Sequence, residues 1–341
     1  MNQYLIRNMQ RFRLRALFND YLKVTARSQS SLSDNPTIGF VGLGNMGLPM
    51  CLNLLDKFPK SNILAHDLSS DTVAVAVKNG ARPVASPVAM LNSSNDGDLP
   101  PPDFIITMLP GCSAVRSVYS ELLSAMSPTS KETILIDCST VSPLTSKELH
   151  NKVASMSPPH KLSMLDAPVS GGVNGAKNAT LTFMVGGSDA TFTAANPLLA
   201  AMGANVIHCG GPSTGAAVKV CNNLALASQM IGIAEAMTLG ESLGVDVTTL
   251  RNVMNRSTAG CWSCEVNNPH PEVGAVAKSG YKGGFGTMLM LKDLGLAIGA
   301  AEEKGVALPI GSLSKELYKL CDKQGMGGKD FGVVFELLKG K

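Results

Sequence analysis

Short apolar runs alternate with longer stretches of helical periodicity between residue 37 and about residue 208. The apolar runs predict strands at Thr37–Val41, Asn62–Asp67, Phe104–Met108, Thr133–Asp137, Leu162–Asp166, Leu181–Val185 and Asn205–His208. The periodic stretches predict helices over Met46–Asp56, Ser70–Asn79, Ala114–Ser124, Pro143–Ser155 and Ala190–Met202. Strands and helices that alternate in this way form βαβ units, so we expect a parallel sheet.

The pattern changes after Gly210-Gly211-Pro212. One long helix is predicted from Thr214 to Leu243, ended by Gly244, because the stretch contains no proline. Further helices are predicted over Val247–Asn255, Met288–Lys304 and Pro309–Lys323, and no strand-rich region follows. The expected fold class is therefore α/β over residues 36–212, followed by an all-α C-terminal domain over residues 213–341. A length of 341 residues also favours two domains.

The first 35 residues differ from the rest in composition. On a helix their apolar side chains share one face and their arginines lie opposite; these residues are Leu5, Met9, Phe12 and Ala16, and Arg7, Arg11 and Arg15. An amphipathic, arginine-rich and acid-poor leader followed by serines is typical of a mitochondrial transit peptide. We therefore expect import into the mitochondrial matrix and leave residues 1–35 out of the fold prediction; a solvated basic tail is the alternative.

The formal net charge of +3 comes from this leader. Residues 1–36 hold six basic and two acidic side chains, and the remaining chain holds 23 basic and 24 acidic ones. Because the chain after the leader is nearly neutral, its sequence gives no sign of the basic surface that nucleic-acid binding requires. The most apolar long segment, Ala216–Met237, contains Lys219, Asn223 and three further polar residues, which excludes a membrane-spanning helix.

A glycine-rich motif directly follows the first predicted strand and opens a helix: Gly42-Leu43-Gly44-Asn45-Met46-Gly47. Such a turn lets the backbone approach a pyrophosphate, which the helix N-terminus then binds. Asp67 ends the second predicted strand, at the spacing of the acidic residue that binds the adenosine ribose. No cation follows Asp67 before Lys78, so we expect a Rossmann-type domain that prefers NAD over NADP. A helix cap is the alternative reading of Asp67.

Other clusters follow strand ends, where the ligand crevice of an α/β sheet lies. They are Met108-Leu109-Pro110, Asp137-Cys138-Ser139-Thr140 and Asp166-Ala167-Pro168-Val169-Ser170-Gly171-Gly172. In the long helix, Lys219 precedes Asn223 by one turn, so both side chains face the same way. No metal is expected, because the five histidines lack ligand spacing and the Cys261-Trp262-Ser263-Cys264 stretch has no second pair.

Together these motifs resemble the β-hydroxyacid dehydrogenase family over about residues 37–341. The resemblance rests on Phe-Val-Gly-Leu-Gly-Asn-Met-Gly at 40–47, Asp-Ala-Pro-Val-Ser-Gly-Gly at 166–172, Lys-Val-Cys-Asn-Asn at 219–223 and Leu-Lys-Asp-Leu at 291–294. The stretches Gly260–Ser263, Asn268-Pro269 and Gly283-Gly284-Phe285 narrow it to the branch that acts on 3-hydroxyisobutyrate. It implies NAD-dependent oxidation of this small hydroxy acid to methylmalonate semialdehyde, in valine degradation, by a homodimer or homotetramer.

The resemblance also implies roles for individual residues. Lys219 matches the catalytic lysine, Asn223 the substrate-orienting asparagine, and Ser170, Gly171 and Gly172 the loop that holds the substrate carboxylate. Leu109, Pro110 and Thr140 match cofactor contacts, and Lys292 matches a second lysine near the cofactor and substrate. Ala114 departs from the family, since relatives often have a polar residue there. The stretch Ser93–Asp103 is expected to be a surface loop. Its residues 93–102 make this loop longer than is usual for the family.

Chemistry points to the same lysine. Alcohol oxidation needs a group that takes the hydroxyl proton while hydride leaves carbon, and neither a zinc set nor a His–Asp pair is evident. Lys219 would serve as this base if burial lowered its pKa, whereas a surface lysine is the alternative. Two further functions stay open: a reductase of another semialdehyde, such as tartronate or succinate semialdehyde, and a non-catalytic nucleotide-binding relative.

Overall fold

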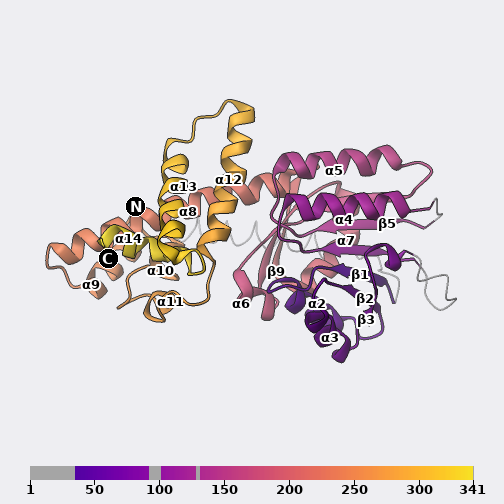
Figure 1. Cartoon of the computed structure of the whole chain (residues 1–341), viewed down its shortest axis with the longest axis horizontal. Coiled ribbons are helices and arrows are strands. Elements are labelled where there is room, and N and C mark those ends of the chain that lie inside the picture. Colours follow the sequence, from indigo (N-terminus) through magenta and orange to yellow (C-terminus); the bar gives the residue numbers. More distant parts are fainter. Residues whose placement is uncertain (1–34, 92–100, 128–130, 341) are drawn as a thin grey trace, which may run out of the picture.

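The computed structural model describes residues 35–91, 101–127 and 131–340. Almost all of the predicted leader, and most of the predicted surface loop Ser93–Asp103, lie outside the described residues. Figure 1 shows a sheet covered by helices on both faces at one end of the molecule, and a group of helices at the other end.

One nine-stranded sheet forms the first part of the chain, in the order β3-β2-β1-β4-β5-β6-β8-β7, with β9 paired to β8. The strands are β1 (Thr37–Val41), β2 (Asn62–His66), β3 (Arg82–Pro83), β4 (Phe104–Thr107), β5 (Thr133–Asp137), β6 (Leu162–Asp166), β7 (Val169–Ser170), β8 (Leu181–Gly186) and β9 (Gly203–Gly210). The first six run parallel in the order 3-2-1-4-5-6 of a Rossmann fold. The carboxyl ends of β1, β2, β4, β5 and β6 therefore meet along one edge.

The expectation of a parallel sheet is wrong for its last strands. β8 runs antiparallel to β6 and to β7, and only β9 returns to a parallel pairing with β8. The link between β6 and β8 contains the two-residue strand β7 and the six-residue helix α6 (Gly172–Lys177). A helix of this length rises only about 9 Å, too little to carry the chain back along the sheet. β8 therefore runs toward the end of β6, and its last residue, Gly186, pairs with Asp166, the last residue of β6.

Helices cover both faces of the sheet (Figure 1). On one face the apolar core contains side chains of α2 (Gly47–Lys57), α3 (Ser70–Lys78), α6 and α7 (Asp189–Met202). On the other face it contains side chains of α4 (Cys112–Ala125) and α5 (Pro143–Met156). The central strands are buried on both faces, which explains why their sequences read as continuous apolar runs.

The second part of the chain is helical. Its elements are α8 (Thr214–Ser242), α9 (Val247–Arg256), α10 (Trp262–Glu265), α11 (Ala275–Lys278), α12 (Thr287–Lys304), α13 (Pro309–Cys321) and α14 (Val334–Lys339). Short turns of other helix types are η1 (Val88–Met90) in the sheet domain and η3 (Asp322–Met326) and η4 (Phe331–Val333) before α14. The predicted fold class, a Rossmann-type domain followed by an all-α domain, is confirmed, although the short helices α10, α11 and α14 were not predicted.

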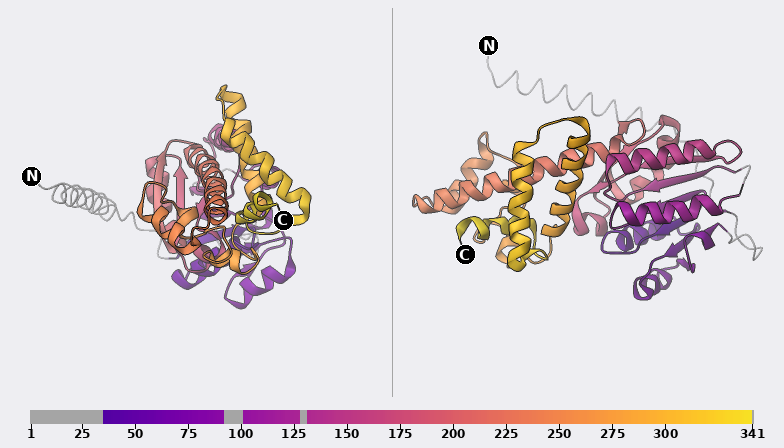
Figure 2. Two further views of the ribbon diagram at one scale, coloured as in Figure 1. Left: turned by 90° about the vertical axis from the view of Figure 1, so that its left-hand side faces the viewer. Right: turned by 45° about the horizontal axis from the view of Figure 1, so that its top comes forward.

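Helix α8 joins the two parts. Its N-terminal end packs on β8 and β9, and its remaining length supports α12, α13 and α14 (Figure 2). The helices of the second part have their own apolar core, separate from the two clusters on the sheet. Within the described ranges, no helix combines the length and the apolar character that crossing a membrane requires.

Candidate active site

The glycine-rich turn between β1 and α2 is packed so tightly that two of its glycines accept no side chain. Gly42 has φ +95°, and a Cβ on it would collide with the carbonyl oxygen of Met108. A Cβ on Gly47 would collide with the carbonyl oxygen of Gly42. Gly44 is different, because a Cβ there would meet no protein atom within 4 Å. Its lack of a side chain leaves space at the surface of the turn, as the approach of a pyrophosphate requires.

The N-terminus of α2 fits an anion. No side chain caps it, and its first turn contains no acidic residue. The first-turn amides of a helix have no acceptors within the helix, and the helix dipole makes this end positive. The turn from Gly42 to Gly47 therefore suits the phosphates of a dinucleotide. Of its other residues, Leu43 is buried, Asn45 is exposed and Met46 is half-buried.

Asp67 lies beside this turn. Its Oδ2 accepts a hydrogen bond from the Leu43 amide at 2.6 Å, and its Oδ1 accepts one from the Ser69 amide at 2.8 Å. The second contact lies in the turn that leads into α3, but the cap of α3 is Ser69, whose side chain accepts from the Thr72 amide, so Asp67 is not the helix cap of the alternative reading. The first contact places a half-buried carboxylate against the phosphate turn.

The loops after β4 and β5 are joined to each other. The Leu109 amide donates to Ser139 Oγ at 2.8 Å, and the Ser139 amide donates to Asp137 Oδ1 at 3.1 Å. Thr107 Oγ1 donates to the same carboxylate oxygen at 2.8 Å, and burial raises the pKa of Asp137 to about 6. These bonds hold the predicted cofactor contacts Leu109, Pro110 and Thr140 on one edge. The motif analysis did not single out Ser139, although it precedes Thr140 in the same cluster.

Ala114 lies in the first turn of α4, which follows the β4 loop. No side chain caps this helix either. A methyl group contributes no hydrogen bond, so any polar contact made here by relatives is missing in this chain.

Lys292 extends from α12 to these two loops. Its Nζ donates to the carbonyl oxygen of Thr140 at 3.1 Å and to that of Pro110 at 3.5 Å. It also forms an ion pair with Asp293 Oδ1 at 3.2 Å. Lys292 and Asp293 are therefore not a solvent-facing pair: the lysine connects the helical domain to the cofactor edge of the sheet, and Asp293 is buried.

Lys219 and Asn223 lie one turn apart on the buried face of α8, with 6% and 2% of their surfaces exposed. Asn223 Nδ2 donates to Asp293 Oδ2 at 2.5 Å, which connects α8 to α12. Among the described residues, the Lys219 amine has no hydrogen bond or ion pair. A buried amine without a partner is unusual and has capacity to bind a ligand.

Burial decides the protonation of this amine. Desolvation lowers the pKa of Lys219 from its ordinary value near 10.5 to about 8. The negative charge of Asp293 opposes the shift, and the positive charge of Lys292 adds to it. At mildly alkaline pH a large fraction of Lys219 is therefore neutral and can accept a proton.

This pKa predicts a pH profile. If the neutral amine accepts the alcohol proton, kcat/KM for oxidation rises tenfold per pH unit below pH 8 and levels off above it. Reduction of the aldehyde needs the ammonium form, so its kcat/KM falls above pH 8. Initial rates in both directions between pH 6 and 10 measure both limbs. If kcat/KM for oxidation kept rising up to pH 10, burial would not be what sets the pKa of the catalytic base.

The predicted carboxylate loop runs from Ser170, the last residue of β7, to Gly172, the first residue of α6. Ser170 is half-buried, and Gly171 and Gly172 have φ values of +133° and +63°. Consecutive positive φ values strongly favour glycine, and a Cβ on Gly172 would meet no protein atom within 4 Å. Asn53 on α2 donates from Nδ2 to the carbonyl oxygen of Ala176 at 2.7 Å, which connects α6 to the helix of the phosphate turn.

Two groups of predicted site residues are thus held together by contacts. In the phosphate turn, Gly42 packs on Met108 and Leu43 bonds to Asp67. In the second group, Asn223 and Lys292 both contact Asp293, and the charges of Asp293 and Lys292 act on Lys219. The site prediction missed Asp293 as a functional residue. Its spacing from Met290 and Ala297 places it on the buried face of α12, and an acidic residue on such a face was the available signal.

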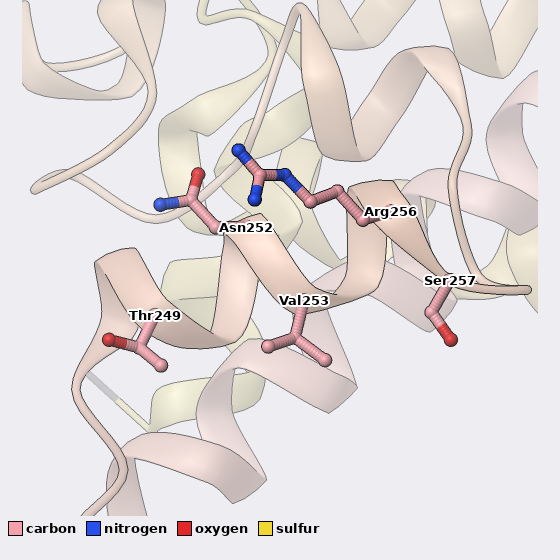
Figure 3. Close-up of a pocket in the computed structure, with 5 residues that line it drawn as sticks. All are labelled: Thr249, Asn252, Val253, Arg256 and Ser257. Carbon is pink, nitrogen blue, oxygen red and sulfur yellow. The ribbon is translucent and has the colours of Figure 1, made fainter.

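A shallow depression elsewhere does not belong to this site. Figure 3 shows its lining, Thr249, Asn252, Val253, Arg256 and Ser257, along and just past α9. All five residues are exposed, and α9 lies at the end of the molecule away from the sheet (Figure 1). None of them is a predicted site residue. In the described part of the chain, no group of three or more His, Cys, Asp or Glu residues could hold a metal ion.

Two family models match the chain. Residues 37–211 match the NAD binding domain of 6-phosphogluconate dehydrogenase, and residues 213–338 match the NAD-binding domain of NADP-dependent 3-hydroxyisobutyrate dehydrogenase. The boundary between the two matches coincides with the start of α8.

The chain is similar to named relatives over almost its whole length. It is 41% identical to the mitochondrial 3-hydroxyisobutyrate dehydrogenase of Drosophila melanogaster over 327 residues, which covers 95% of this chain and 96% of the relative. It is 40% identical to the corresponding Homo sapiens protein over 330 residues, which covers 96% and 93%.

Solved structures show the same arrangement. The 3-hydroxyisobutyrate dehydrogenase of Mycobacterium tuberculosis, determined with L-serine, is 38% identical and superposes with a TM-score of 0.79, covering 89% of this chain and 99% of that one. The Salmonella typhimurium structure named 3-hydroxyisobutyrate dehydrogenase is 26% identical, with a TM-score of 0.70 and coverage of 89% and 100%.

Proposed function

Because this chain belongs to the β-hydroxyacid dehydrogenase family, alongside the 3-hydroxyisobutyrate dehydrogenases, we propose that it catalyses the NAD-dependent oxidation of 3-hydroxyisobutyrate to methylmalonate semialdehyde, a step in valine degradation. The observation that carries this proposal is the amine of buried Lys219, which has no hydrogen-bond or ion-pair partner among the described residues and whose pKa is lowered to about 8. A surface lysine, the alternative considered from the sequence, would be exposed and solvated.

In this proposal, Lys219 is the residue that transfers the proton. Bound NAD supplies the hydride acceptor. As hydride leaves the alcohol carbon, the neutral Lys219 amine accepts the hydroxyl proton, and in the reverse direction its ammonium form donates a proton to the aldehyde oxygen. Asn223 lies one turn along α8 and is held by Asp293, so its side chain is oriented before substrate binds.

Substrate and cofactor are held by the surrounding backbone. Ser170, Gly171 and Gly172 offer a hydroxyl group and backbone amides of unusual geometry, which suit a carboxylate. The turn Gly42–Gly47 suits the cofactor phosphates, and the loops with Leu109, Pro110 and Thr140 lie along the same sheet edge. Lys292 holds the helical domain against those loops and so positions α12 near the cofactor.

Cofactor choice depends on Asp67 in this proposal, because a carboxylate repels the 2′-phosphate of NADP. We expect Asp67→Ala to lower the preference for NAD over NADP by ~10-fold or more. The measurement is kcat/KM with each cofactor at saturating substrate. Asp71→Ala is the matched control, because Asp71 is an exposed acid on the first turn of α3 and makes no contact with the phosphate turn. An unchanged ratio in Asp67→Ala would mean that the ribose is recognised elsewhere.

The substrate is tested by turnover. We expect purified protein to oxidise 3-hydroxyisobutyrate with NAD at a higher kcat/KM than L-serine, glycerate or 4-hydroxybutyrate. A preference for glycerate or 4-hydroxybutyrate would favour the tartronate or succinate semialdehyde alternative. Absence of NADH binding in a fluorescence titration would favour the non-catalytic relative.

We also propose a mitochondrial matrix location and a homodimeric or homotetrameric state. The first is supported by the amphipathic basic leader and by relatives that are named mitochondrial. The second is supported by exposed apolar side chains of the helical domain, among them Leu239, Leu243, Val253 and Val266.

A further inference from the structure

Asp166, the last residue of β6, makes three hydrogen bonds inside the protein. Its Oδ1 accepts from the Ser213 amide at 2.8 Å and from His150 Nε2 at 2.8 Å. Its Oδ2 accepts from the Ala216 amide at 2.7 Å. Only 1% of its surface is exposed. The carboxylate therefore caps the start of α8 from another element, 47 residues earlier in the chain.

This cap differs from the caps of other helices in the molecule. Helices α3, α5, α7 and α9 begin at a Ser or Asp whose own side chain accepts an amide of the first turn. Helix α8 begins at Ser213, which has φ +68° and no side-chain cap. A local cap would satisfy the amides of α8 without restricting where the helix lies. The long-range cap also fixes the helix start against the end of β6.

Close packing leaves this junction little freedom. A Cβ on Gly215 would collide with the carbonyl oxygen of Met184 and would lie 2.8 Å from that of Asp166. A Cβ on Gly186 would lie 2.6 Å from Asp166 Oδ1 and 2.8 Å from Gly215 N. The first turn of α8 thus rests on the backbone of β6 and β8, with the Asp166 carboxylate enclosed between them.

Both halves of the proposed substrate site start from this junction. Along the chain, Ser170 of the carboxylate loop follows Asp166 by four residues. Lys219 follows Ala216 by three residues, a rise of about 4.5 Å along α8. The position of the Asp166 carboxylate therefore links the group that holds the acid end of the substrate to the amine that meets its hydroxyl.

We propose that Asp166 is a positioning residue that fixes the separation between the Ser170–Gly172 loop and the Lys219 amine, and thereby selects acids whose hydroxyl group lies on the third carbon. The inference rests on the proposed function. His150, on α5, donates a hydrogen bond to Asp166 Oδ1 and so supports this role indirectly, by holding the carboxylate in place. A shorter or longer hydroxy acid would reach one of the two groups and miss the other.

The test is Asp166→Asn, which turns one oxygen into a donor facing a backbone amide or His150. We expect kcat/KM for 3-hydroxyisobutyrate to fall by ~10²-fold, as a misplacement of about 1 Å can cause. Activity with 4-hydroxybutyrate should fall much less, so the ratio between the two substrates drops. NADH affinity should stay unchanged. A purely structural role would lower both activities in proportion and leave the ratio constant.

Asp246→Asn is the matched control, because Asp246 caps the neighbouring helix α9 through the Thr249 amide and is exposed. The ratio of substrates should not change in that variant. His150→Ala, which removes one of three donors to Asp166, serves if Asp166→Asn fails to fold; we expect the same change in ratio at ~3- to 10-fold. If Asp166→Asn folds and its ratio of activities on the two substrates equals that of the wild type, the inference is overturned; if Asp166→Asn does not fold, the same outcome in His150→Ala overturns it. Wild-type protein that is inactive on 3-hydroxyisobutyrate would overturn the proposed function instead.

Discussion

Replacing Lys219 with methionine is expected to lower kcat by ~10³-fold or more in both directions, while NADH affinity barely changes. Removing a general acid or base typically costs 10²- to 10⁴-fold. Lys292 is not free to replace the lost amine, because it is engaged by Thr140, Pro110 and Asp293. Methionine keeps an unbranched chain in a site that is 6% exposed, so packing should be preserved.

The measurements are steady-state kinetics, an NADH fluorescence titration and thermal unfolding on the same preparation. Lys278→Met is the control, because Lys278 ends α11 and is exposed, so the same change should leave kcat unaltered. Lys219→Ala leaves a cavity, so a small primary amine such as ethylamine should restore part of the oxidation activity. The restored rate of oxidation should increase with pH, because only the neutral amine accepts a proton. Turnover of Lys219→Met at the wild-type rate would remove this lysine from the mechanism.

Replacing Gly47 with alanine is expected to weaken NADH binding by ~10²-fold and to lower the thermal stability of the protein. The added Cβ would collide with the carbonyl oxygen of Gly42 and would lie 3.3 Å from the Phe40 ring. Since the Gly42 oxygen belongs to the turn and Phe40 to buried β1, neither can move freely, and α2 must shift away from the sheet. The phosphate-binding amides shift with it.

Gly44→Ala separates the two roles of the turn. A Cβ at this position meets no protein atom within 4 Å, so the free protein should unfold at the wild-type temperature. NADH binding should nevertheless weaken, because the methyl group would occupy the space next to the turn. Equal NADH affinity in wild type and Gly44→Ala would show that the pyrophosphate does not approach this residue.

Much of the fold could be predicted from local pattern. The bounds of β1, β5 and β6 match the apolar runs to the residue. β1 and β5 are buried along their whole length, and in β6 the half-buried Ser163 interrupts the apolar run only once. The long helix α8 also ends where expected, before Gly244 with φ +78°. The short helices α10, α11 and α14 were missed because four to six residues are too few to show a helical period.

The contacts of the site also fall into those that the local sequence predicts and those that it does not. The phosphate turn is one continuous segment, so its residues and spacing could be recognised directly. The contact of Asn223 with Asp293 joins residues 70 positions apart, and that of Lys292 with Pro110 joins residues 182 apart. The local sequence predicts neither pairing. Asp166 was noted only as the start of a motif, since its partners Ser213 and Ala216 lie beyond three further strands.

By itself, the sequence determined the two-domain order, the positions of the longer strands and helices, and the kinds of group available for chemistry. Tertiary structure alone decided that β8 runs antiparallel to β6, that Lys219 is buried, and that its pKa falls as a result. The physical reason is that periodicity and turn geometry act between neighbours in the chain. Desolvation and long-range hydrogen bonds depend instead on which segments the fold brings together.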